Sequence, residues 1–176
     1  MCGKFYLPNG GRSGLSAWMS AEIFFRDYRA TDLEAMFQLD EACFAEEFRF
    51  DRESMREFAE ERNAIVRIAE KACGEIVGFV VVHVEHVVTG WRAYVVTLDV
   101  AVECRQRGLA RRLMREVEAS AMAAGVRWMQ LHVFTGNAGA IRFYERLGYE
   151  RISTQQDFYG EAGLDAFVYG KELHAL

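Results

Sequence analysis

The most informative part of the sequence for the fold is Tyr94-Val-Val-Thr-Leu-Asp-Val-Ala-Val-Glu-Cys-Arg-Gln-Arg-Gly-Leu-Ala110. Its first part is apolar and rich in β-branched residues, which indicates a strand, and the loop 105–110 leads directly into a helix. One face of that helix carries apolar residues at spacings of four, four, four and three, namely Leu109, Leu113, Val117, Ala121 and Ala124. A strand followed at once by an amphipathic helix is typical of an α/β fold.

The loop before this helix has the composition of an anion site. Backbone N–H groups at a helix N-terminus lack partners, and the helix dipole adds a partial positive charge there. Gly108 lets a bulky anion approach the backbone, and full charges come from Arg105, Arg107 and Arg111. We therefore expect a diphosphate cradle, although a plain connection with solvated arginines has the same composition. The loop lacks the Gly-Lys-Ser/Thr of a P-loop and the first glycine of a dinucleotide fingerprint.

The rest of the chain predicts alternating strands and helices. Strands are expected at 22–28, 64–72, 76–86, 91–101, 127–134, 149–158 and 165–173, and helices at 31–43, 52–62, 109–124 and 138–147. Thr31-Asp-Leu-Glu34 has the form of a capping box, and Asp51 is the expected cap of the second helix. This order predicts an α/β sheet with helices on both faces, mixed rather than all parallel.

Composition narrows the class of protein. The 176 residues suit one domain, which we place at 21–176 after a flexible leader at 1–20, with Met19 as an alternative start. The net charge of −5 argues against a nucleic-acid partner and suits a cationic one, such as an amine. No apolar run has the length of a membrane span. The four cysteines lack metal-site spacing, so we expect free thiols in a reducing cytoplasm and no metal.

Two motifs resemble those of the GNAT superfamily of acetyl-CoA-dependent N-acetyltransferases. The loop from Arg105 to Ala110 is similar to its R/Q-x-x-G-x-G/A signature. The segment Asn137-Ala-Gly-Ala-Ile-Arg-Phe-Tyr144-Glu-Arg-Leu-Gly-Tyr149 is similar to N-x-x-A-x-x-F/L-Y-x-x-x-G-F/Y. The order of elements agrees over roughly residues 22–174. The resemblance implies a mixed, mostly antiparallel central sheet and an enzyme that uses acetyl-CoA.

Within the superfamily the chain resembles the protein N-terminal (Nα) acetyltransferases, including the ribosomal-protein-alanine acetyltransferase type. Leu131-His132-Val133 is similar to their L-E/H-V strand, and Tyr94-Val-Val-Thr-Leu98 to the Y-x-M-T-L strand of the branch that acts on Met-starting peptides. Asp157-Phe-Tyr159 followed by Asp165-Ala-Phe is similar to the N-Y-Y…D-A ending. Phe44-Ala45 departs from the Phe-Pro of the Met-acting branch, so the peptide specificity stays open.

The resemblance assigns roles to particular residues. It implies that Tyr94 and His132 act as base, with a water between them to relay the proton, and that Tyr144 protonates the leaving thiolate. The residues expected to bind acetyl-CoA are Leu98, Val100, Arg105, Gln106, Arg107, Gly108, Leu109, Ala110, Arg111 and Asn137. Asp99, a carboxylate inside an apolar strand, either pairs with an arginine, faces solvent or holds the substrate amine.

Each assignment has a plainer alternative. His132 has the pattern of a half-buried strand histidine, pointing away from Leu131 and Val133. Tyr94 and Tyr144 also suit core aromatics with bonded hydroxyls, and Asn137 suits a simple N-cap.

By resemblance, two loops should form the substrate groove, 43–50 with Phe44, Phe48 and Phe50, and 155–164 with Tyr159. Glu46, Glu47 and Glu161 would favour a cationic amine. The leading function is acetyl transfer to a protein or peptide N-terminus. The alternatives are a small-amine acetyltransferase, for polyamines or aminoglycosides, and a non-catalytic acetyl-CoA-binding module. The protein is expected to be a monomer or homodimer in the cytoplasm.

Overall fold

The computed structural model describes residues 22–174, and the expected leader at 1–20 lies outside them. The strands are β1 (Ile23–Asp27), β2 (Ala64–Lys71), β3 (Ile76–Val87), β4 (Gly90–Val100), β5 (Trp128–Phe134), β6 (Glu150–Tyr159) and β7 (Leu164–Glu172). The α-helices are α1 (Leu33–Cys43), α2 (Arg52–Glu60), α3 (Leu109–Ala123) and α4 (Ala138–Arg146). Short 3₁₀ turns occur at η1 (Ala30–Asp32), η2 (Glu46–Phe48), η3 (Val102–Cys104) and η4 (Gly160–Ala162).

The strands of the described chain form one sheet in the order β1-β2-β3-β4-β5-β7-β6. Neighbouring strands are antiparallel except β4 and β5, which are parallel. These two strands pair only at Ala93–Met129 and Tyr94–Gln130, near the start of each, and then separate. The mixed, mostly antiparallel sheet expected from the sequence is confirmed, with an opening between its two central strands.

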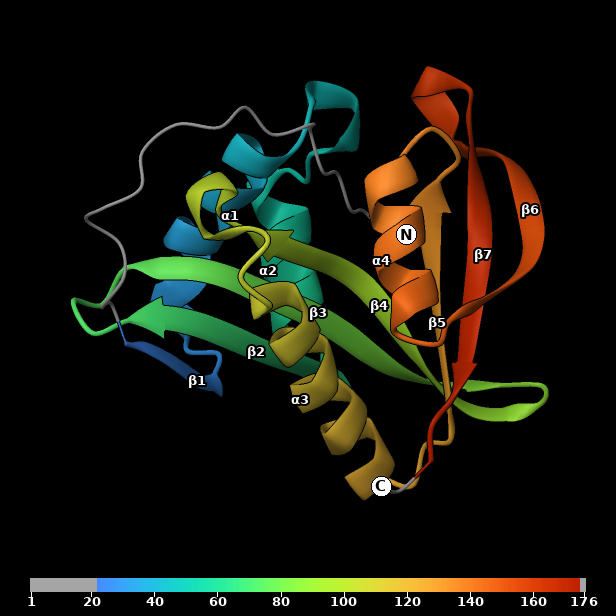
Figure 1. The fold of residues 1–176 in the computed structure, drawn as a ribbon, viewed down its shortest axis with the longest axis horizontal. Helices are drawn as coiled ribbons and strands as arrows, with labels where there is room; N and C mark the ends of the chain where they lie inside the picture. Colours follow the sequence, from blue (N-terminus) through green and yellow to red (C-terminus); the bar gives the residue numbers. More distant parts are fainter. Residues whose placement is uncertain (1–21, 175–176) are drawn as a thin grey trace.

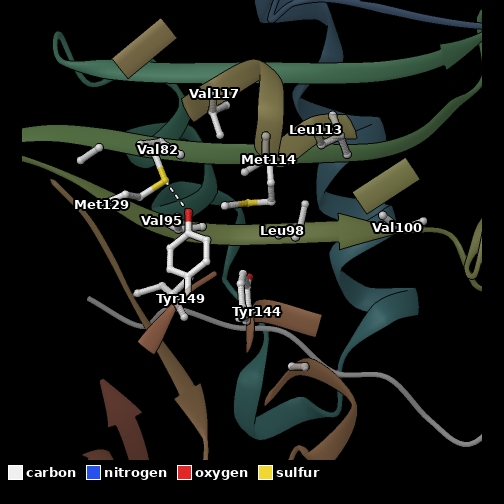
Figure 2. Close-up of a cluster of buried hydrophobic side chains, with 14 of the residues drawn as sticks. Val82, Val95, Leu98, Val100, Leu113, Met114, Val117, Met129, Tyr144 and Tyr149 are labelled. Carbon is white, nitrogen blue, oxygen red and sulfur yellow. Dashed lines mark hydrogen bonds between the residues drawn. The ribbon is translucent and has the colours of Figure 1, made fainter. Parts of the chain in front are cut away.

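Helices cover both faces of the sheet, as predicted (Figure 1). On one face α3 and α4 bury a large core together with β4 and β5, part of which is shown in Figure 2. On the other face α1 and α2 bury a second core against β2, β3 and β4. Leu109, Leu113, Val117 and Ala121 of α3 are buried as expected, whereas Ala124 is the exposed C-cap of the helix.

Strand β4 has one extra residue between two of its pairs with β3. Val82 pairs with Val95 and Val81 with Thr97, so Val96 is a bulge. A bulge shifts the alternation of side chains by one residue. Ala93 and Val95 therefore face α3, as Leu98 and Val100 do farther along, while Tyr94 and Val96 face α1 and α2.

The helix ends follow local chemistry, with one correction. Asp51 caps α2, because its Oδ1 accepts from Ser54 N at 2.7 Å. At the first helix the expected box from Thr31 to Glu34 is wrong: Asp32 accepts from Arg29 N at 2.7 Å instead, and the 3₁₀ turn η1 precedes α1. Arg26 forms an ion pair with Asp32, and this buried pairing outweighs the local Thr31 signal.

Candidate active site

The loop between β4 and α3 has the backbone geometry of an anion cradle. Gly108 caps α3 in the left-handed region with φ +82°, and nothing lies within 4 Å of the position that a Cβ would take there. Gln106 also has a positive φ, of 61°. The first backbone bond of the helix is from Arg112 N to Gly108 O at 3.0 Å, so the preceding N–H groups have no intrahelical acceptor. Those groups belong to Leu109, Ala110 and Arg111.

The arginines of this loop differ in placement. Arg107 and Arg111 are exposed beside the helix N-terminus, where their charges are available to an anion. Arg105 is turned inward, with its Nε donating to Val100 O at 2.8 Å. Its Nη1 is buried and has no hydrogen-bond partner among the described residues. We therefore expect Arg105 to fix the end of β4 and to offer one donor toward the opening.

The opening between β4 and β5 exposes backbone groups of β4. Ala101 N donates to Val77 O of β3 at 2.9 Å, so by alternation the N–H and C=O of Leu98 and Val100 face the β5 side. Asn137 caps α4 nearby, its Oδ1 accepting from Ala140 N at 3.0 Å. Its buried Nδ2 has no partner within residues 22–174. The helix cap uses the amide oxygen of Asn137, and its Nδ2 donor is suited to an acceptor on a ligand.

Tyr94 and His132 are joined by a hydrogen bond of 2.9 Å between the hydroxyl and Nδ1. They lie on β4 and β5 where the two strands diverge, and both are buried. The other ring nitrogen of His132, Nε2, lies 3.0 Å from Gln155 Oε1. Burial lowers the pKa of His132 below 6.5, against an opposing effect of the Gln155 bond, and the charge of Arg92 lowers it further. The imidazole is therefore neutral at pH 7 and able to accept a proton.

Tyr144 of α4 lies beside the part of β4 that carries Leu98 (Figure 2). It is 2% exposed, and burial raises the pKa of its hydroxyl far above the usual 10. Tyr159, Asp99 and Tyr94 add to the rise, so these groups lie close to the hydroxyl. A tyrosine in this environment keeps its proton at neutral pH.

Asp99 is buried beside this group of tyrosines. Thr97 donates to its Oδ1 at 2.5 Å. In an unbroken strand Tyr94 and Asp99 would point to opposite faces, and the bulge at Val96 places them on the same one. The solvent-facing alternative for Asp99 is wrong, since the residue is 1% exposed.

The Cys43 thiol lies at the same edge of the site. Burial raises the pKa of Cys43 to about 12, with Asp99 contributing, and its Sγ lies 3.4 Å from Val100 O. This thiol stays protonated and is no nucleophile at neutral pH. Cys43, Cys73 and Cys104 are all free, as expected, and Cys2 lies outside the described residues.

Aromatic residues from the two expected substrate segments pack together. Phe48 contacts Tyr159 edge-on with ring centroids 5.0 Å apart, and Phe44 belongs to the same buried cluster. Glu46 and Glu47 are exposed beside it. The second segment is not a loop as predicted, because residues 155–159 belong to β6 and only η4 with Gly163 turns the chain. The structure describes no side chain for Glu161.

Three residues of this site were given no individual role by the sequence. Gln155 bonds His132, and the Phe158 ring stacks on its imidazole at 3.9 Å and 3°. Arg92, held by Glu85 at 2.8 Å, lies over the Tyr94 ring. The sequence does not indicate such contacts, because the partner of a strand residue depends on the order of the strands in the sheet.

No helix among residues 22–174 is long and apolar enough to cross a membrane. Nor does that part of the chain contain a group of His, Cys, Asp or Glu side chains with the arrangement of a metal site.

Known proteins resemble this chain in sequence and in fold. The catalytic subunit NAA10 of the N-terminal acetyltransferase A complex from Arabidopsis thaliana is 30% identical over 111 residues, or 62% of this chain. The match spans 57% of that curated relative's length.

Two solved structures have the same fold. Arabidopsis thaliana NAA60 in complex with acetyl-CoA has a TM-score of 0.76 at 23% identity, over 88% of this chain and 100% of the other. The ribosomal-protein-S18-alanine N-acetyltransferase from Escherichia coli has a TM-score of 0.75 at 20% identity, over 88% and 96%. The model of the acetyltransferase (GNAT) family matches residues 33–149, which include the cradle, the Tyr94–His132 pair and Tyr144. The chain belongs to the acetyltransferase (GNAT) family.

Proposed function

We propose that the protein transfers the acetyl group of acetyl-CoA directly to the N-terminal α-amine of a protein or peptide. The observation that carries this proposal is the Tyr94–His132 pair at the point where β4 and β5 diverge, with the Tyr144 hydroxyl near it. A base and an acid with opposite perturbations of their pKa thus face one opening, which is the arrangement that acyl transfer to an amine needs.

The residues of the opening fit acetyl-CoA. When bound, acetyl-CoA supplies the thioester whose C–S bond breaks as the C–N bond of the product forms. The N–H groups at the start of α3, with Arg107 and Arg111, suit its diphosphate. Asn137 Nδ2, the N–H and C=O of Leu98 and the N–H of Val100 suit the amide-containing arm between diphosphate and thioester, while the Val100 carbonyl is held by Arg105. These edge groups are available because β5 leaves the sheet register at Tyr94.

The hydrogen bonds define a path for the amine proton. With Gln155 Oε1 as acceptor, Nε2 of His132 carries the ring proton, so Nδ1 accepts from the Tyr94 hydroxyl. The Tyr94 oxygen can then receive a proton from the amine, directly or through a water, while its own proton passes to Nδ1. Tyr144 gives its proton to the departing thiolate. The protonated state of the Cys43 thiol argues against acetylation of that cysteine as an intermediate step, which supports direct transfer.

An α-amine suits this base better than a lysine does. The reference pKa of an α-amine is about 7.7–8.0 and that of lysine about 10.4. A histidine whose pKa lies below 6.5 is a weak base, so it deprotonates the more acidic amine more readily. The apolar cluster with Phe44, Phe48 and Tyr159, next to exposed glutamates, suits an apolar first residue and a cationic amine. The names of the relatives point to the same substrate class.

A thiol-release assay tests the proposal. We expect coenzyme A release with peptides that have a free N-terminus, and none with the same peptides blocked at the α-amine but containing lysine. Faster turnover of polyamines or aminoglycosides would make the protein a small-amine acetyltransferase. Tight acetyl-CoA binding without release on any amine would make it a non-catalytic module.

Gly108→Glu is expected to raise the Kd for acetyl-CoA at least about tenfold, because it places bulk and negative charge where the helix N-terminus attracts an anion. Calorimetry measures the effect. Gly74→Glu is the matched control, since Gly74 also has a left-handed φ (+88°) and open space around it but lies in the β2–β3 turn. Both variants bear the same backbone strain of about 1–2 kcal/mol. Equal affinities of the two variants would show that the cradle assignment is wrong.

A further inference from the structure

Strand β6 contacts His132 although β7 lies between it and β5 in the sheet. Gln155 pairs with Ala166 of β7, and His132 pairs with Val168 of the same strand. The Gln155 side chain crosses β7 and brings Oε1 to 3.0 Å from Nε2. Gln155 is an exposed residue as a whole, so this contact is not a consequence of burying its side chain.

Strand β6 has a bulge directly after Gln155. Between the pairs Gln155–Ala166 and Tyr159–Leu164 it carries more residues than β7. Asp157 in this bulge has a φ of 49°, and its N–H donates to Asp165 Oδ1 at 3.0 Å. The left-handed turn brings Phe158 onto the imidazole, stacked at 3.9 Å. A bulge that re-aims a side chain is a common feature of strands beside active sites.

We propose that Gln155 is a positioning residue, whose side-chain oxygen holds the His132 proton on Nε2 and so keeps Nδ1 as the acceptor for Tyr94. An amide oxygen only accepts, which makes the ring nitrogen that faces it the donor. Without this acceptor the neutral ring can carry its proton on Nδ1, and Nδ1 then cannot accept the Tyr94 proton. The inference rests on the proposed function, in which that acceptor is the end of the proton path.

The other groups around the ring do not fix the tautomer. Tyr94, from β4, can donate or accept, and Phe158, from β6, offers only a ring face. Arg92, from β4, is a cation whose side chain bonds Glu85 of β3 and Gln130 of β5. Its charge opposes protonation of His132 but acts on both tautomers. Of the described residues in contact with the ring, Gln155 supplies the acceptor that favours one tautomer over the other.

Nitrogen-15 NMR of the two ring nitrogens of His132 tests the proposal on the full chain, with His132→Ala used for assignment. We expect wild type to show Nε2–H as the neutral tautomer. Gln155→Leu should give a mixture of tautomers and a lower pKa for His132, since a bond to the protonated form is lost. Gln155→Glu should keep Nε2–H and raise the pKa of His132, because a carboxylate is the stronger acceptor. If Gln155 had only a structural role, the two substitutions would not shift the pKa of His132 in opposite directions.

Activity provides the second measurement. Gln155→Leu should lower kcat/KM for a peptide at least roughly tenfold, as expected on loss of a tautomer-orienting partner. The affinity for acetyl-CoA should be unchanged. Gln156→Leu, at the neighbouring exposed position, is the matched control and should match wild type in both measurements.

The outcomes separate the inference from the function on which it rests. Unchanged tautomer and pKa of His132 in Gln155→Leu and Gln155→Glu would overturn the inference even if peptides are acetylated. The expected NMR changes without acetylation of any N-terminal peptide would support the tautomer assignment and overturn the proposed function. If Gln155→Leu fails to fold, Gln155→Glu decides, because a pKa of His132 at or below that of wild type overturns the inference.

Discussion

Tyr144→Phe is expected to lower kcat by about 10²–10⁴-fold, the usual contribution of a general acid. The hydroxyl is buried and its pKa is raised, so it holds the proton that a leaving thiolate needs. Phenylalanine keeps the ring and its edge contacts with Phe143 and Tyr149, so the affinity for acetyl-CoA should change little. Single-turnover kinetics with one peptide, together with calorimetry, measure the two quantities.

Tyr149→Phe is the control for this result. Its ring lies 5.5 Å from that of Tyr144 in the same core, but its hydroxyl bonds Glu118 and Met129 at 3.0 and 2.9 Å, away from the opening (Figure 2). We expect Tyr149→Phe to lower stability and to leave kcat near wild type. Equal rates for Tyr144→Phe and wild type, where chemistry limits turnover, would reduce Tyr144 to a packing residue.

His132→Ala is expected to lose most activity near pH 7 and to recover toward wild type as pH rises. The pKa of His132 lies below 6.5, so the imidazole is a neutral base throughout this range. The amine needs the base only while it is protonated, below about pH 7.7–8.0 for an α-amine. Above that range the amine loses its proton without help, and the defect should shrink. Profiles of kcat/KM against pH for one peptide show this directly.

His132→Glu should restore part of the activity, because a carboxylate is also a base. His83→Ala is the matched control, since His83 is another buried strand histidine, with Nε2 2.8 Å from Phe58 O. It should lose thermal stability without a pH-dependent catalytic defect. If His132→Ala behaves like His83→Ala and gains nothing from Glu, His132 only packs.

The sequence predicted what depends on local patterns. The spacing of Leu109, Leu113, Val117 and Ala121 defined α3, which begins directly after Gly108. The candidate site residues came from motif resemblance. The structure brings Tyr94, His132 and Tyr144 to one opening, and their roles stay predictions.

What the sequence missed depends on pairing between distant strands. The bulge at Val96 exists only relative to β3, and the Gln155 contact requires β6 to lie two strands from β5. The inward turn of Arg105 is set by the end of β4 and by α1, not by its neighbours in the loop. The capping box at Thr31 failed for the same reason, since Arg26 on β1 supplied a partner for Asp32.

The bulge in β4 also bears on how such a chain can change over evolutionary time. Deleting Val96 would restore regular alternation, so that either Tyr94 or the segment from Leu98 onward would point to the wrong face. The cradle at Arg105–Arg111 follows that segment and would be displaced with it. Between Tyr94 and Gly108 we therefore expect the length of the chain to be under stronger constraint than the identity of most side chains. Related chains should tolerate substitutions in this segment more readily than insertions or deletions.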